Sequence, residues 1–315
     1  MDFNPGPFYT GSFPISLNFY SLDANLKAWL KGLDDAPKLD TLSAIRLAQA
    51  AGFDGVDVTA YYIPGYEPSS LPQIAEAEVI ESVHAIRRLA EDLHMAISGT
   101  GVGNDFVHPD EQVRLTHISR TKYWTRMAKE MGAPVLRVFS GPIPADLDAM
   151  GWEQVVGTRL VPALQEIAEY AAAYGVAIGL QNHGDMLSTA DQIIHTIQWA
   201  DCPNLGIIND TGSFRPFRGS AVNYDWYHDI AKALPYSIGF QVKEHPDGPG
   251  SEEWLDLPRF FSILRQSAYR GYLPIELLWR QGEAEHPGQR VAPPFEDIAR
   301  FLSRVRRAMN ESANL

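Results

Sequence analysis

The chain has a single cysteine, no run of basic residues and no long apolar stretch, and each shortage excludes a class of protein. Cys202 alone can form neither an internal disulfide nor a thiolate metal cluster. The 26 Lys and Arg residues are outnumbered by 39 Asp and Glu residues, and the resulting net charge of −13 argues against a nucleic-acid partner.

The start of the chain points away from a membrane. Residues 1–11 are polar and rich in Gly and Pro, so neither a signal peptide nor a membrane span is visible. We therefore expect a cytoplasmic protein that contacts no membrane, although a chain whose export signal had been removed would look the same. At 315 residues with 45% hydrophobic content, the chain can bury a large core without disulfide or metal support.

Short β-rich runs recur along the whole chain, at intervals of 29 to 42 residues. That interval leaves room for a strand, a helix and two loops in each unit. The eight runs begin near Pro14, Gly55, Met95, Pro134, Val176, Leu205, Ile238 and Tyr272.

Amphipathic helical patterns fill the spaces between these runs. They cover residues 39–51, 74–93, 110–131, 152–174, 188–200, 226–234, 257–268 and 295–309. Glycines at positions 52, 132 and 175 mark the ends of three of them. Strands and helices alternate without a break in composition.

This alternation predicts one α/β domain over residues 1–315, a (β/α)8 TIM barrel. Residues 1–12 would form an N-terminal extension, and residues 282–294 a loop or arm before the last helix. A doubly wound open sheet is the competing fold. It is less favoured because residues 99–103 (GTGVG) only partly resemble a dinucleotide-binding turn and precede a loop.

Polar residues gather where the later strands end, which is where a barrel carries its chemistry. Strand five ends in Gln181-Asn182-His183, strand six in Asn209-Asp210-Thr211, and strand seven in Gln241-Val242-Lys243-Glu244-His245. Because side chains alternate along a strand, Gln181 shares a face with His183, and Gln241 with Lys243. Glu276 lies inside the apolar eighth run and should meet a cation or a hydrogen-bonding partner.

These strand ends carry a resemblance to a known family. The motifs QNH at 181–183, DTG at 210–212, QVK at 241–243 and YRGY at 269–272, followed by Ile275-Glu276, resemble the xylose-isomerase-like sugar isomerase/epimerase superfamily. The segments AGFDGV at 51–56 and MGAP at 131–134 extend the similarity, so that it covers the chain from about Pro14 to Met309. The resemblance implies a carbohydrate substrate and a barrel that often pairs into a homodimer.

In the metal-dependent members of that superfamily, Glu, Asp, His and Glu at the ends of strands five to eight hold one divalent ion, and the two Glu exchange protons with the sugar. The matching positions here are Gln181, Asp210, Gln241 and Glu276. The set keeps two carboxylates and replaces two ligands by Gln. As an all-oxygen set of charge −2 it suits Mg²⁺ or Mn²⁺, bound weakly or not at all.

The two glutamines also change the acid–base chemistry, because Gln neither takes nor gives a proton near neutral pH. Glu276 remains as a general base, with His183, Lys243 or His245 as a second acid or base. One-base chemistry, such as β-elimination or enolisation beside a carbonyl, survives this loss better than a two-carboxylate shuttle.

Other polar residues are weaker candidates for binding a substrate. Asp57 on strand two and Arg137 on strand four can point into the barrel, where a buried polar layer is the alternative reading. Arg215, which lies in the loop after Asp210, can clamp a carboxylate or phosphate if it is not simply solvated. Asp210 and Glu276 can also form a structural salt bridge to Lys243 or Arg137.

The expected function is that of an isomerase or epimerase that abstracts a proton beside a carbonyl of a carbohydrate, assisted by a divalent metal. A lyase or hydrolase that acts on oxidised (3-keto) glycosides and a non-catalytic sugar-binding barrel are the alternatives. The DNA-cutting branch of the superfamily is disfavoured by the net charge of −13.

Overall fold

Eight parallel strands close on themselves in the order in which they occur along the chain. The computed structural model describes residues 9–34, 36–183, 186–219, 224–244, 255–278, 280–281, 290–291 and 295–313. Each strand begins within one residue of an expected run, which confirms the barrel. The bounds are Ile15–Asn18 (β1), Gly55–Asp57 (β2), Ala96–Gly101 (β3), Val135–Val138 (β4), Ala177–Gln181 (β5), Leu205–Asp210 (β6), Ser237–Glu244 (β7) and Leu273–Leu277 (β8).

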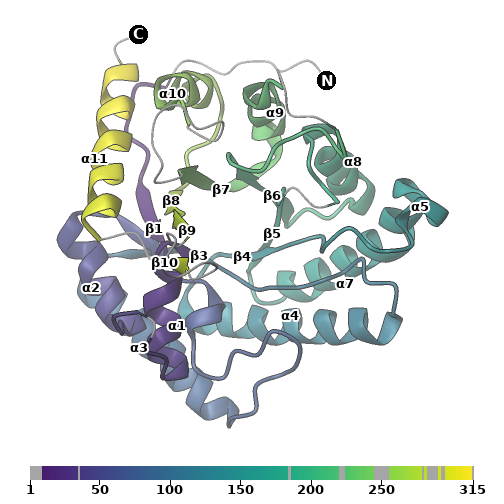
Figure 1. Cartoon of the computed structure of the whole chain (residues 1–315), viewed down its shortest axis with the longest axis horizontal. Coiled ribbons are helices and arrows are strands. Elements are labelled where there is room, and N and C mark those ends of the chain that lie inside the picture. Colours follow the sequence, from purple (N-terminus) through teal and green to yellow (C-terminus); the bar gives the residue numbers. More distant parts are fainter. Residues whose placement is uncertain are drawn as a thin grey trace.

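Helices surround these strands (Figure 1), and all eight expected helical segments form. The helices are α1 (Asp23–Lys31), α2 (Thr41–Ala51), α3 (Glu76–Asp92), α4 (Glu111–Met131), α5 (Leu147–Met150), α6 (Trp152–Val155), α7 (Val161–Ala172), α8 (Ala190–Ala200), α9 (Trp226–Ala233), α10 (Leu257–Arg265) and α11 (Phe295–Ser312). Short 3₁₀ turns lie at Phe19–Leu22, Ala60–Tyr62 and Leu234–Tyr236.

Local sequence explains where several helices begin and end. The Asp40 carboxylate accepts a hydrogen bond from the Ser43 N–H at 2.9 Å and so caps α2. Gly52 and Gly132, with φ of 90° and 85°, end α2 and α4 in the left-handed conformation that glycine tolerates best. The single long helix expected over residues 152–174 is instead divided by a π-helical turn, Val156–Leu160. Pro162 follows this turn and has no N–H to continue the ladder of hydrogen bonds.

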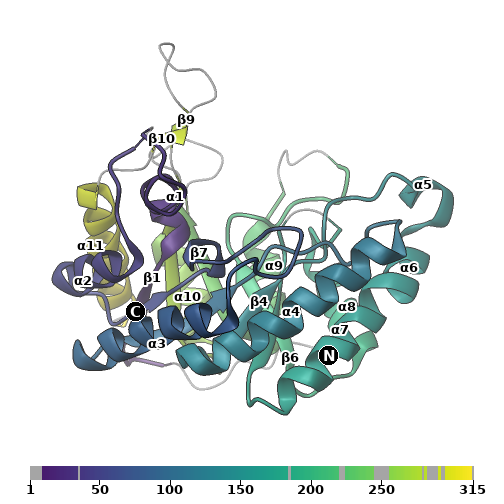
Figure 2. The same cartoon turned by 90° about the horizontal axis from the view of Figure 1, so that it is seen from below.

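The carboxyl ends of the strands lie at one end of the barrel, toward the top of Figure 2. α1, α5 and the two-stranded pair β9 (Arg280–Gln281) and β10 (Arg290–Val291) all lie on that side. Each of them follows the carboxyl end of a barrel strand, as expected for the loops that carry barrel chemistry. The rest of the proposed arm at residues 282–294 lies outside the described residues. Among the helices described, none is long and apolar enough to cross a membrane.

Two glycines and one isoleucine fill the barrel interior beneath the strand ends. A Cβ atom on Gly179 would lie 2.5 Å from Ile208 Cδ1, and one on Gly239 would lie 2.7 Å from the same atom. Ile208 therefore occupies the space that side chains on the two neighbouring strands would need. Gln181, Asp210 and Gln241 each lie two residues further along these three strands and so share the inward face one layer higher.

A buried arginine joins the first and last parts of the described chain. Arg265, at the end of α10, donates hydrogen bonds to the carbonyl oxygens of Tyr9 and Gly11. It also donates to the Met309 carbonyl oxygen and to Ser312 Oγ, near the end of α11. Its side chain is 1% exposed. The barrel closes where β1 meets β8, with Ile15 beside Leu273, and Arg265 reinforces that closure.

Candidate active site

The four matched positions come together at the carboxyl ends of β5 to β8. Gln181, Asp210, Gln241 and Glu276 are all buried. Asp210 lies beside Gln241 in the register of β6 and β7, and Lys243 beside Glu276 in that of β7 and β8. Both carboxylates and both glutamines therefore line the same end of the barrel, as the alternation of side chains predicts.

Asp210 is held in place by several hydrogen bonds and an ion pair. Its Oδ2 accepts hydrogen bonds from Gln181 Nε2 at 2.6 Å and from Ser213 Oγ at 2.8 Å, and it pairs with Lys243 Nζ at 2.8 Å. Its backbone is held as well, because Asn182 accepts from the Asp210 N–H and donates to its carbonyl oxygen. Burial alone would raise the pKa of Asp210, but Lys243 and these hydrogen bonds more than offset that effect and lower it.

Lys243 lies between the two carboxylates. Its Nζ is 2.8 Å from Asp210 Oδ2 and 3.7 Å from Glu276 Oε1, and 11% of the side chain is exposed. Burial lowers the pKa of Lys243, but the two neighbouring carboxylates raise it well above its ordinary value. The side chain is therefore a permanent ammonium ion at neutral pH.

Glu276 differs from Asp210 in having an unused oxygen. Its Oε1 is buried and has no hydrogen-bond partner among the described residues, since Lys243 lies beyond hydrogen-bonding distance. Burial raises the pKa of Glu276, and Asp210 raises it further, while Lys243 opposes the shift. A buried carboxylate oxygen without a donor is costly unless something else uses it.

Two further charged residues, Asp57 and Arg137, lie in the same barrel. Burial raises the pKa of Asp57 to about 6, against the influence of Arg137 and with a further contribution from Glu276. Arg137 donates to the Val102 carbonyl oxygen at 2.9 Å, and its guanidinium lies 4.1 Å from the centre of the Phe139 ring. Both residues point into the barrel, and the electrostatic coupling places Asp57 near Glu276.

The remaining candidates are more peripheral. His183 is exposed, with its ring 4.5 Å from that of Phe139, and it contributes to the lowered pKa of Asp210. Arg215 is exposed, and its backbone N–H donates to the Ser188 carbonyl oxygen. His245 lies outside the described residues.

Two residues that donate hydrogen bonds to the site were not expected from the sequence. Asn18, at the end of β1, donates from Nδ2 to Gln241 Oε1 at 2.7 Å, and Ser213 donates to Asp210. Asn18 is a polar residue within the first β-rich run, and this is the same signal that singled out Glu276.

The donor set can be tested against the divalent cation that the resemblance implies. Gln181 turns its amide nitrogen toward Asp210, and the oxygen of Gln241 already accepts from Asn18. Asp210 Oδ2 accepts from three donors, one of which is the Lys243 ammonium. Among the described residues, no three His, Cys, Asp or Glu side chains are grouped so as to hold a metal. In this arrangement the residues do not fit a divalent cation.

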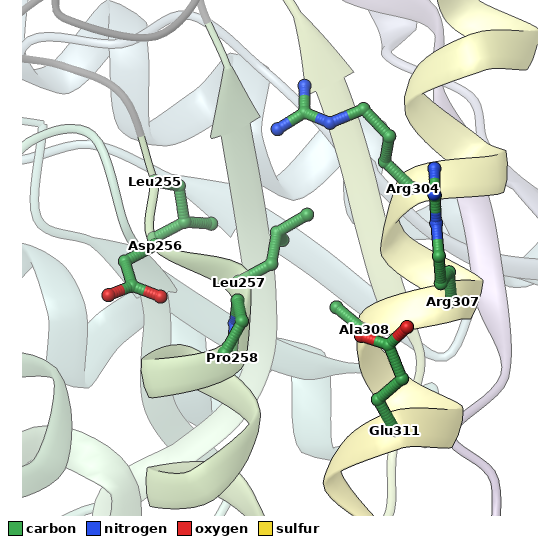
Figure 3. A pocket seen from close by; sticks show the side chains of 8 residues that line it. All are labelled: Leu255, Asp256, Leu257, Pro258, Arg304, Arg307, Ala308 and Glu311. Atoms are coloured by element: carbon green, nitrogen blue, oxygen red, sulfur yellow. The ribbon is translucent and has the colours of Figure 1, made fainter.

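The last residue of β7 faces outward. The Glu244 carboxylate pairs with Arg304 on α11, as the alternation of side chains along β7 requires. A surface pocket of about 510 Å³ lies here, between the start of α10 and α11 (Figure 3). Arg304 and Arg307 line one side, and the Asp256 carboxylate points away from α11. This pocket belongs to the outer layer and not to the barrel interior.

Comparison with known proteins agrees with the fold and with the strand-end motifs. A family model described as a xylose isomerase-like TIM barrel matches residues 45–308. The chain belongs to this family. No curated protein matches the chain in sequence.

Solved structures of the same architecture include several sugar epimerases. L-ribulose 3-epimerase superimposes with a TM-score of 0.65 at 15% identity, covering 96% of each chain. D-psicose 3-epimerase, solved in the presence of D-fructose, gives 0.65 at 16% identity, covering 86% of this chain and 94% of its own. The 3-keto-D-glucoside 4-epimerase from E. coli, in its apo form, gives 0.64 at 16% identity, covering 84% and 94%. At these identities the likeness is one of fold.

Proposed function

We propose that this xylose isomerase-like barrel is a sugar isomerase or epimerase that removes a proton from the carbon beside a carbonyl group. Glu276 is the base, and Lys243 and Asp210 lie next to it at the strand ends. Asp57, Arg137, His183 and Arg215 contact the substrate around this centre, and His245 follows Lys243 in the sequence.

The buried Oε1 of Glu276, which accepts no hydrogen bond from the described residues and lies 3.7 Å from Lys243 Nζ, is the observation that carries this proposal. A carboxylate whose pKa is raised by burial is a stronger base than one in water. A substrate C–H or hydroxyl bound beside Glu276 would supply the proton or hydrogen-bond donor that this oxygen lacks. The neighbouring ammonium supplies positive charge where the substrate oxygen becomes negative.

The proposed reaction begins with the transfer of a proton from the substrate to Glu276. Glu276 takes the proton from the carbon beside the carbonyl, and the C–H electron pair forms the double bond of an enediolate while the carbonyl pair moves to oxygen. Donation of a proton to the opposite face of the same carbon by His183, with release of the Glu276 proton to solvent, gives an epimer. Return of the Glu276 proton to the former carbonyl carbon, with transfer of the neighbouring hydroxyl proton to the former carbonyl oxygen, gives an isomer.

The class of substrate follows from this step. It must be a carbohydrate with a carbonyl group beside an acidic carbon, such as a ketose or a keto-glycoside. Structurally similar proteins act on L-ribulose, D-psicose and a 3-keto-D-glucoside, to judge by their names, and this supports the same choice here.

One observation favours a lyase or hydrolase acting on 3-keto glycosides as a second candidate. Gln181 stands where the resembling enzymes have their other proton-exchanging carboxylate, and its amide is bonded to Asp210. An enolate that expels a leaving group needs one base at the start and no second carboxylate at that position.

One incubation separates these outcomes. The protein is mixed in deuterated water with a panel of ketohexoses, ketopentoses and 3-keto-glucosides, and the sugars are recovered and analysed by mass spectrometry and NMR. Deuterium beside the carbonyl supports the isomerase or epimerase, and a released aglycone supports the lyase. Glu276→Gln, which keeps the side-chain shape, should reduce either reaction about 10²- to 10⁴-fold.

Glu311→Gln on the outer face of α11 serves as the matched control and should react like the wild type. If a sugar binds in calorimetry but undergoes neither reaction, the protein is a non-catalytic sugar-binding barrel and the proposed enzymatic function is refuted. Equal turnover by the wild type and Glu276→Gln would also refute the assignment of the base.

A further inference from the structure

We infer that the Lys243 ammonium is a built-in replacement for the divalent cation, and that it polarises the substrate carbonyl without any metal. This inference rests on the proposed function for its chemistry, but its charge argument stands on the geometry alone.

The position of the ammonium is the first support. Nζ lies between the carboxylates of β6 and β8, at 2.8 Å from Asp210 and 3.7 Å from Glu276. These are the only two charged residues among the four matched positions. A divalent cation bound to both carboxylates would lie within a few ångströms of Nζ, which already carries a positive charge, whichever oxygen of Asp210 it used.

The net charge is the second support. Asp210 and Glu276 together carry −2, and Lys243 reduces this to −1. A divalent ion added beside the ammonium would reverse the sign of this charge and place two cations within a few ångströms of each other in a buried site, where their repulsion is costly.

The two glutamines give the third support, because both side-chain amides are already engaged by neighbouring side chains. Gln181 donates its N–H to Asp210 on the same oxygen that Lys243 uses. Gln241, two residues before Lys243 on β7, has its oxygen engaged by Asn18. Gln181 therefore supports the pairing of Asp210 with Lys243, and the oxygen of Gln241 is already in use as an acceptor.

The chemical role follows from the donors that a lysine has. An ammonium carries three N–H groups, of which one is directed to Asp210. The others are available to a substrate oxygen beside Glu276. As Glu276 takes the proton, the negative charge that develops on that oxygen meets the ammonium at short range in a water-poor site.

Metal binding tests this inference independently of any turnover. Wild type, Lys243→Met, Lys243→Arg and Lys232→Met are freed of metal and titrated with Mn²⁺, while free Mn²⁺ is followed by electron paramagnetic resonance. Lys232 is an exposed lysine on α9 that pairs with Asp191 and provides the matched control. Removing the ammonium should uncover a −2 site, so Lys243→Met should bind one Mn²⁺ at least about tenfold more tightly than the wild type. The other three proteins should bind equally weakly.

Turnover is then measured with the wild type in the presence and absence of a chelator, which does not depend on any variant folding. Deuterium exchange should be the same in both. Stoichiometric Mn²⁺ binding by the wild type, or loss of its exchange on chelation, overturns the inference and leaves the proposed function intact. Tight Mn²⁺ binding confined to Lys243→Met, with no sugar exchanged by any protein, supports the charge replacement and refutes the proposed function instead.

Discussion

Replacing Asp57 by Asn should stabilise the protein at neutral pH. Burial raises the pKa of Asp57 from its ordinary 3.8 to about 6, with the influence of Arg137 already included. A tenfold change in proton affinity corresponds to about 1.4 kcal/mol, so the ionised carboxylate lowers the free energy of unfolding by about 3 kcal/mol at pH 7.5. Asn resembles the protonated acid in shape and carries no charge.

The sign follows from proton binding. Between pH 3.8 and 6 the folded protein binds more protons than the unfolded chain, so stability falls as pH rises through this window and the loss is complete above it. The advantage of Asp57→Asn over the wild type should therefore be about 3 kcal/mol at pH 7.5 and only about 1 kcal/mol at pH 4.5.

Urea unfolding followed by circular dichroism at these two pH values measures both differences. Asp148→Asn is the control, because its side chain is 82% exposed, and it should change stability by less than about 0.5 kcal/mol. A variant at position 57 that is no more stable than the wild type at pH 7.5, or whose advantage does not shrink in acid, would refute the reasoning. A gain in stability accompanied by a loss of turnover would show that the carboxylate is kept for chemistry.

Three further predictions concern packing and charge. The pKa of His117 is lowered to about 4 by burial and by Arg120, so protonation of this residue in the unfolded chain should lower stability by on the order of 1–2 kcal/mol between pH 7 and pH 5. The change in stability over this interval, measured by thermal unfolding, should differ between the wild type and His117→Gln by that amount. Gly179→Ala should destabilise the barrel by about 1–3 kcal/mol in urea unfolding, because the added Cβ meets Ile208. Adding Ile208→Val should recover part of this loss, and equal stability of the single and double variants would contradict the contact. Arg265→Met should lower stability by about 2–3 kcal/mol, since the partly buried carbonyl oxygens of Tyr9 and Gly11 lose their donor, whereas the same change at the exposed Arg259 should have little effect.

Much of the barrel follows from the sequence because its signals are local. β-rich runs with regular spacing and amphipathic segments between them specify strands and helices one unit at a time. The short helices α1 and α5 were not expected, because each is an additional helix in a β/α unit to which the apolar pattern already assigned a longer one. The division of the long helix near Pro162 depends on hydrogen bonds that the apolar pattern does not report.

The sequence predicts which residues form the site but not which of their side-chain atoms interact. Alternation along a strand is enough to place Gln181 and Gln241 on the inward face. The location of Lys243 between two carboxylates depends on the register of β7 with β8, which puts it beside Glu276, and on the direction of a long flexible side chain. Which oxygen of Glu276 remains unused depends on the same register. These facts arise from the pairing of β7 with β8, in which the partners Lys243 and Glu276 lie 33 positions apart in the chain, and no local pattern encodes that register.

The closure of the barrel by Arg265 and by the pairing of β1 with β8 also has a consequence for the order of events during synthesis. β1 cannot gain its second neighbour until Leu273, 258 residues after Ile15, has been made. At about 5–20 residues per second, the first strand waits roughly 13–50 s with one edge unpaired. The sheet therefore stays open during most of synthesis, and about the last seventh of the 315 residues turns it into a barrel.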